Sequence, residues 1–160
     1  MAMTMETVGL EQLDKMLTEL GDKAQDVASG SLYEGAGVMA SAMNAGIESI
    51  KTEPFRYAPE GKTRLPSPQE KAALQRKIGI ARFQKNGSEV DTLVGLKGTG
   101  YAQIAGKPKA VAVIARSINS GTSFMQKQPV IRRAKSQSQG AAKAAIVKKA
   151  DELITEITKA

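Results

Sequence analysis

The chain contains neither histidine nor cysteine. These two absences exclude more kinds of function than any other feature of the composition. Histidine is the most common general acid or base in enzymes and the most common ligand of transition metals. Without cysteine there are no disulfides and no thiolate metal sites. We therefore expect a protein that is not an enzyme and that needs no cofactor or metal. An enzyme built on Asp, Glu, Lys, Ser or Tyr side chains stays open as a third hypothesis.

Aromatic residues make up only 4% of the chain and tryptophan is absent. Alanine, methionine, isoleucine and leucine must therefore supply most of the packing, which favours helices in close contact. No apolar run approaches the ~20 residues of a membrane span, and no signal-peptide pattern precedes the first predicted helix. A chain of 160 residues fits one domain, since domains usually have ~100–200 residues. We expect a single soluble, cytosolic domain.

Charge is distributed unevenly along the chain. Residues 1–50 carry eight acids and two lysines, whereas residues 51–149 carry twenty Lys or Arg and five acids. This asymmetry favours either an anionic partner or head-to-tail contact between copies of the protein. A solvated surface of mixed charge is an equally open interpretation.

The first third of the sequence predicts two helices. Leucines at positions 10, 13, 17 and 20 recur at helical spacing, and Gly21 is a plausible end of this short helix. A longer helix is predicted from Asp22 or Ser31 to Lys51, because its apolar side chains fall on one stripe. That stripe consists of Leu32, Ala36, Met39, Met43, Ile47 and Ile50. Glycines and alanines surround it, which indicates close packing.

Residues 52–68 contain four prolines and three Lys or Arg. Proline interrupts a helix, so the segment is predicted to be a flexible basic loop. Long loops inside a compact domain are usually functional or disordered. We expect this loop to become ordered only on assembly.

The second half predicts strands and a final helix. A short helix from Gln69 to about Arg76 leads into a hairpin, whose strands begin at Ile78 and cover Glu89–Leu96 around an Asn86-Gly87 turn. A third strand is predicted at Ala110–Ser117, and an extended connection over residues 118–133 follows it. The last helix is predicted from about Ser138 to the C-terminus, with the stripe Ala142, Ile146, Ala150, Leu153 and Ile157. The fold class is α+β: a small antiparallel sheet of about three strands, packed by a long N-terminal helix and a C-terminal helix.

Several short motifs follow one another in a recognisable order. Gly9-Leu10-Glu11-Gln12-Leu13 opens the first helix, and Ala58-Pro59 lies in the basic loop. Gly121-Thr122 is followed by Gln128-Pro129-Val130-Ile131 and then by Arg133-Ala134. In this order the chain resembles the minor tail-component or neck proteins of long-tailed double-stranded-DNA bacteriophages. It departs from their pattern at Gly61-Lys62-Thr63-Arg64-Leu65, where Thr-Gly-x-Leu is usual, and at Val130, where an aromatic residue is usual.

The resemblance implies a structural virion protein of the neck over residues 1–160. Such a protein would form a homo-oligomeric ring that joins the head connector to the tail terminator or tail tube, with DNA passing through the lumen without specific binding. It would be assembled in the host cytoplasm and end in the virion. We expect contacts to neighbouring proteins at Arg56, Arg64, Phe124, Met125, Arg132 and Arg133. The alternative is a small basic protein that binds DNA non-specifically.

Overall fold

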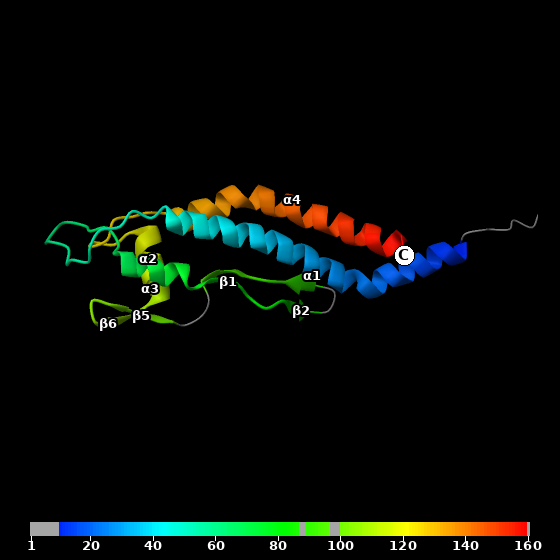
Figure 1. Ribbon diagram of the computed structural model, residues 1–160, viewed down its shortest axis with the longest axis horizontal. Helices are drawn as coiled ribbons and strands as arrows, with labels where there is room; N and C mark the ends of the chain where they lie inside the picture. The colour runs from blue at the N-terminus through cyan, green and yellow to red at the C-terminus, as the bar shows by residue number, and fades with distance from the viewer. Residues whose placement is uncertain (1–9, 87–88, 97–99, 160) are drawn as a thin grey trace, which may run out of the picture.

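Two long antiparallel helices run side by side along most of the length of this computed structural model (Figure 1). The structure describes residues 10–86, 89–96 and 100–159. The long helices are α1 (Leu10–Glu48) and α4 (Val130–Lys159), and two short helices are α2 (Pro68–Gln75) and α3 (Val111–Ser120). The strands are β1 (Ile78–Ile80), β2 (Gln84–Asn86), β3 (Glu89–Asp91), β4 (Val94–Leu96), β5 (Tyr101–Ile104) and β6 (Lys107–Ala110).

Helix α1 is continuous, so the predicted end at Gly21 is wrong. One glycine costs a helix only ~1 kcal/mol relative to alanine, and no proline occurs between residues 10 and 48. Good helix-forming residues on both sides outweigh that cost. The two predicted N-terminal helices are therefore one.

Small residues let α1 and α4 approach closely. A Cβ atom at Gly35 would overlap the side chain of Ile146, and one at Gly46 would lie 3.3 Å from the Cβ of Ala134. The expectation that close packing explains the glycines of this helix is confirmed at these two positions. Helix α4 begins at Val130 rather than near Ser138, because this contact holds its first turns against α1.

The strands form three antiparallel pairs rather than one sheet. Pairs β1–β4 and β2–β3 belong to the predicted hairpin, with Ile78 opposite Leu96 and Ile80 opposite Val94. They lie along α1, while the pair β5–β6 lies near α2 and α3 (Figure 1). Residue 87 of the predicted turn lies outside the described residues. The α+β class, with long N-terminal and C-terminal helices, is confirmed.

The predicted strand at Ala110–Ser117 is wrong, because residues from Val111 onward form α3. Its buried residues Val111, Ile114 and Ile118 recur at helical spacing, whereas Val113 is 60% exposed. The extended connection is correspondingly shorter and covers residues 121–129. The main core gathers around this helix: Ile47, Ile50, Leu74, Ile104, Val111, Ile114, Ala115, Ile118 and Met125. Hydrophobic packing is thus concentrated at one end of the molecule. This end is called here the loop end and comprises residues 49–75 and 101–135.

Candidate protein-binding surface

Two loops, residues 49–67 and residues 121–129, form the tip of the loop end (Figure 1). The Arg64 amide donates to the Phe124 carbonyl oxygen at 2.9 Å, and the Gln126 amide donates to the Arg64 carbonyl oxygen at 2.9 Å. The Gln128 side chain accepts from the Lys51 amide at 2.9 Å and donates to the Lys51 carbonyl oxygen at 3.0 Å. These bonds hold both loops together as one surface.

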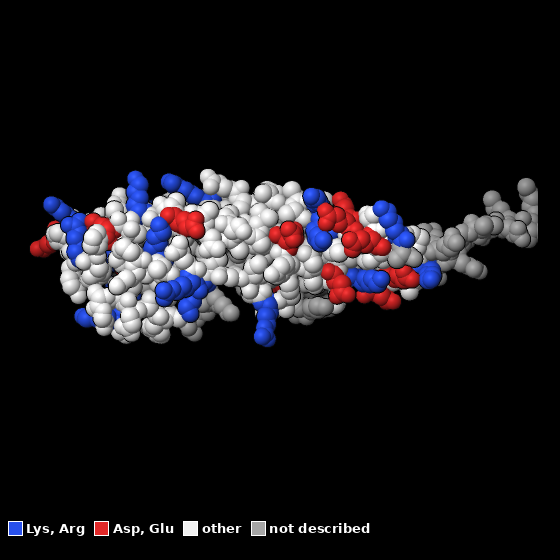
Figure 2. Space-filling model, viewed as in Figure 1, with Lys and Arg blue, Asp and Glu red and all other residues white. Residues whose placement is uncertain are grey.

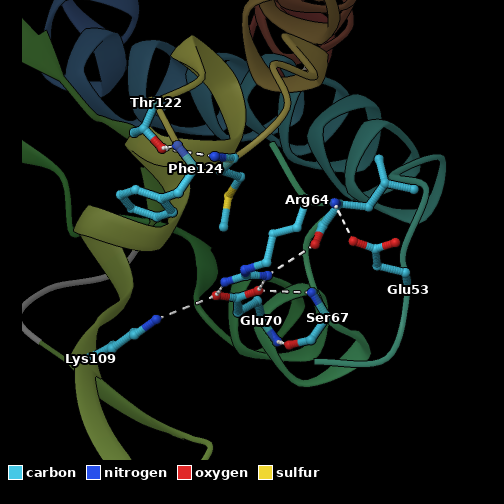
Figure 3. A network of polar contacts seen from close by, with 9 residues as sticks. Glu53, Arg64, Ser67, Glu70, Lys109, Thr122 and Phe124 are labelled. Carbon is cyan, nitrogen blue, oxygen red and sulfur yellow. Dashed lines mark hydrogen bonds and ion pairs between the residues drawn. The ribbon is translucent and has the colours of Figure 1, made fainter. Parts of the chain in front are cut away.

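A buried ion pair lies beneath these loops (Figure 3). The Arg64 guanidinium donates two hydrogen bonds to the Glu70 carboxylate, at 2.8 and 2.7 Å, and both side chains are at most 3% exposed. A bidentate arginine–carboxylate pair is both strong and geometrically specific. The side chain of Arg64 therefore fixes the first loop to α2.

Glu70 also forms the N-terminal cap of α2. Its carboxylate accepts from the Ser67 amide at 2.8 Å, while the Ser67 hydroxyl accepts from the Glu70 amide at 3.2 Å. Burial raises the pKa of Glu70, but the bonds from Arg64 and Ser67 outweigh it and hold that pKa below its usual value. Bonding to Glu70 raises the pKa of Arg64. Both groups are thus charged at neutral pH.

The ion pair extends to the β5–β6 hairpin and to an aromatic ring. The Lys109 ammonium lies 3.8 Å from the Glu70 carboxylate and 5.6 Å from the centre of the Phe55 ring. The Arg64 guanidinium lies 4.9 Å from the same centre. Cation–π contacts of this kind favour cations over a desolvated ring. Three segments of the chain, the first loop, α2 and the β5–β6 hairpin, therefore meet at one charged cluster.

The loop predicted at residues 52–68 contains no regular helix before Pro68, as expected. Its second half is nevertheless packed into the protein, since Arg64, Pro66 and Ser67 are buried. Glu53 holds the ends of the loop together, because its carboxylate accepts from the Leu65 amide at 2.8 Å. Ordering of the first half on assembly stays a prediction.

The six residues predicted as contacts divide into two groups. Phe124 is 47% exposed, and Arg56, Arg132 and Arg133 are exposed as well. Arg64 and Met125 are each only 3% exposed, so placing them on a contact surface is wrong. Their side chains hold the two loops in position instead.

Two residues of this region, Tyr57 and Glu70, were not predicted from the sequence. Tyr57 is 76% exposed, and its ring packs edge-on against Phe55 at 5.5 Å. Tyrosine and arginine are the residue types enriched at the centres of protein interfaces. Glu70 could have been found from Ser67-Pro68-Gln69-Glu70, a capping-box pattern that predicts an N-terminal cap. No sequence signal distinguishes Tyr57 from the other loop residues.

Positive charge is concentrated at the loop end. Residues 101–135 carry seven Lys or Arg and no acid. Figure 2 shows several separate cationic side chains and fewer acidic ones at this end, whereas acidic and basic side chains are gathered together at the opposite end. The exposed tyrosine, phenylalanine and arginines thus lie within a strongly basic region, which suits an anionic partner surface.

Residues 10–86, 89–96 and 100–159 contain no group of three Asp or Glu side chains placed to hold a metal ion. Within the same part of the chain, no helix has the length and apolarity needed to cross a membrane.

Comparison of the chain with protein-family models, with curated proteins and with solved structures finds no match.

Proposed function

We propose that the chain is a structural neck protein of a long-tailed double-stranded-DNA bacteriophage, acting in head–tail joining or tail completion as a homo-oligomeric ring. It would bind other virion proteins rather than catalyse a reaction. One face of the ring would meet the head connector, and the other the tail terminator or tail tube. The loop end would supply one of these contacts, through Arg56, Tyr57, Phe124, Arg132 and Arg133.

The observation that carries this proposal is the construction of the loop end. Two loops far apart in the sequence are locked together by backbone bonds and by the buried pair of Arg64 and Glu70. Exposed aromatic and cationic side chains are thereby presented on a rigid base. A preorganised surface loses less entropy on binding than a flexible one, as an assembly contact requires.

The motifs behind the resemblance have structural roles that support the proposal. Gly121 has a φ of 77° at the end of α3, and the Thr122 hydroxyl accepts from the Met125 amide at 3.0 Å. Pro129 directly precedes α4, and Ala134 is buried against Gly46. These four motif residues thus shape the second loop or hold the last helix in place.

The test is particle assembly with the head and tail proteins of the same virus. Omitting the protein should leave heads and tails unjoined in electron micrographs, and adding it back should restore complete particles. The variants Phe124→Ala and Arg132→Ala with Arg133→Ala should lower the yield of joined particles at least tenfold. Val113→Ala, exposed on α3, serves as the control. Joined particles at the parental yield without the protein would refute the proposal.

The seven cations of residues 101–135 favour a second candidate, a small basic DNA-binding protein. Non-specific binding of this kind depends on release of counterions, so its affinity falls steeply as salt rises. Titration of a fluorescent duplex at low and high salt separates the two candidates. Tight, salt-sensitive binding by the isolated chain supports the DNA-binding protein, and its absence supports the neck protein.

A further inference from the structure

A groove lies between helix α2 and strand β5, at the same end of the molecule as the two loops (Figure 1). Its volume is about 460 Å³, which is ordinary for a binding site. Gln69 and Ala72 of α2 recur at helical spacing with Arg76 at the C-terminal cap of this helix, so one face of α2 forms one wall. Tyr101 and Gln103 of β5 form the opposite wall.

The outer edge of β5 has backbone groups that no other described strand bonds. Among the described strands, β5 pairs with β6 alone. The Val111 amide donates to the Gly100 carbonyl oxygen at 2.8 Å, and in an antiparallel pair such bonded positions alternate with positions whose N–H and C=O groups point outward. Tyr101 and Gln103 are therefore outward positions. Their amides and carbonyl oxygens face away from β6, where a further strand can add.

The other edge of the same hairpin is less suited to such an addition. Pro108 of β6 lies opposite Gln103, so it is also an outward position, and proline has no N–H to donate. Proline at an edge position hinders pairing with further strands. The hairpin is thus open to an added strand at β5, which is the side of the groove.

The groove is apolar where it meets the main core. Ala73 and Ala102 line it and pack against that core, and Val111, which also lines it, is only 2% exposed. Alternate side chains of a strand point to the same side. A strand added to β5 should therefore carry an apolar residue at every second position.

One end of the groove is cationic. Lys77 lies against the start of β5, because a Cβ atom at Gly100 would be 2.8 Å from its ammonium nitrogen, and Arg76 precedes it. Among the described residues, neither cationic side chain has an ion pair or a hydrogen bond, and no acid lines the groove. The one acid of α2, Glu70, is buried and bound to Arg64. Carboxylates of an occupant would therefore supply the partner that these two cations lack.

We propose that this groove binds an extended acidic segment of a partner protein, which adds to β5 as a third strand. The main chain of the segment bonds to Tyr101 and Gln103. Its alternate apolar residues face the core, and its carboxylates pair with Arg76 and Lys77. At about 3.3 Å per residue, the four residues of β5 span about 13 Å and pair with a segment of similar length. This inference does not rest on the neck assignment, since the groove lies outside the loops proposed for head or tail contact.

A synthetic peptide tests the groove without changing the protein. The probe is fluorescently labelled Glu-Glu-Val-Thr-Val-Thr-Glu-Glu, and the control peptide has Lys in place of each Glu. Fluorescence polarisation should give a dissociation constant below about 100 µM for the acidic probe and no binding for the control peptide.

Two further versions of the probe carry N-methyl groups, one on the Val amides and one on the Thr amides. Only one version should bind at least tenfold more weakly, because every second amide of an added strand faces its neighbour. A slip of one residue does not rescue it, since the slip turns the Val side chains away from the core.

Hydrogen exchange measured by NMR locates the bound probe. The amides of Tyr101 and Gln103 should exchange rapidly in the free protein, because they point outward from the hairpin. Their exchange should slow at least tenfold when the acidic probe saturates the protein.

Two matched double variants test the charges. Arg76→Ala with Lys77→Ala should weaken binding of the acidic probe at least tenfold. Arg132→Ala with Arg133→Ala removes the same charge from exposed positions of α4 and should change the affinity little. Circular dichroism checks that both variants keep the parental helix content.

Any of four results would overturn the proposal: no binding of the acidic probe, undiminished binding of both methylated versions, amides that stay unprotected, or an equal loss in both double variants. Protection of Tyr101 and Gln103 without any peptide, together with a dimeric mass in light scattering, would also overturn it, because a second copy would then occupy the edge of β5. Particle assembly decides the neck assignment separately, so failure of one proposal does not imply failure of the other.

Discussion

The two ends of the molecule differ in how far their apolar and charged side chains are buried. One is the loop end, and the other is the arm, which comprises residues 10–34 of α1 with residues 143–159 of α4. At the loop end the apolar side chains of four helices gather in one core, and the charged side chains of Arg64 and Glu70 are buried beside it with their polar atoms bonded. In the arm only two helices meet, leucine and valine side chains remain exposed, and charges lie on the surface. The loop end thus has a core of buried side chains within one chain, whereas no described residue of the arm belongs to that core.

The largest effect is expected from breaking the buried ion pair. Arg64→Ala should lower the free energy of unfolding by about 3–5 kcal/mol, because it leaves the Glu70 carboxylate buried without its main partner. Denaturation in urea measures this loss. Arg56→Ala is the control, since its ion pair with Glu53 is at the surface and should matter little. A similar loss in both variants would contradict the contrast between buried and exposed pairs.

Where α1 and α4 pack together, the largest effect is expected from filling the close contact between the two helices. The added methyl group of Gly35→Ala would overlap Ile146 and lie 3.0 Å from the carbonyl oxygen of Ala142. Overpacking of this kind typically costs ~1–3 kcal/mol. The same urea denaturation tests it, and an unchanged midpoint would show that the helices can separate at no cost.

Acid should weaken the ion pair at the loop end. The pKa of Glu70 is lower in the folded protein than its ordinary value of 4.5. Its ion pair therefore contributes stability above pH 4.5, and this contribution is lost as the pH falls through the lower, folded value. Glu70→Gln should be less stable than the parent at pH 7 and should lose less stability between pH 4.5 and 3. Parallel curves of stability against pH for the two proteins would argue against this assignment.

The smallest effect is expected from Gly37→Ala, two residues from the tight contact. A Cβ atom at Gly37 would meet nothing within 4 Å, so the variant gains helix propensity without a clash. It should stabilise the protein by about 0.5–1 kcal/mol. Opposite signs for Gly35→Ala and Gly37→Ala in thermal unfolding would confirm that α4 lies against one side of α1 only.

Much of the local structure could be predicted from the sequence. The apolar stripe of Ala142, Ile146 and Leu153 indicated α4, and the alternation around Ile78 and Val94 indicated the hairpin. The error at Val111–Ser117 came from weighing β-branched residues above spacing. Its apolar residues Val111, Ile114 and Ile118 already had the helical period, but propensity for strands is easily overridden by packing.

The candidate surface could be predicted only in part. Four of the predicted contacts are exposed as expected: Arg56, Phe124, Arg132 and Arg133. Arg64 and Met125 are buried, although nothing in the sequence around them distinguishes them from the other four. Their burial accompanies a bridge between residues 64 and 125, which are 61 positions apart in the chain. No local pattern encodes a contact of that separation.

Helix periodicity, capping at Ser67, the proline-rich loop and the absence of histidine and cysteine follow from the sequence alone, because each depends on residues close together or on composition. The tertiary structure alone decided which cations are buried, and it laid α4, which carries both lysines and acids, antiparallel along the acidic α1. That antiparallel pairing mixes charges that are separate along the chain and leaves the loop end as the strongly basic region. The physical reason is that electrostatic and apolar complementarity act across space, between segments whose order in the sequence does not reveal their distance.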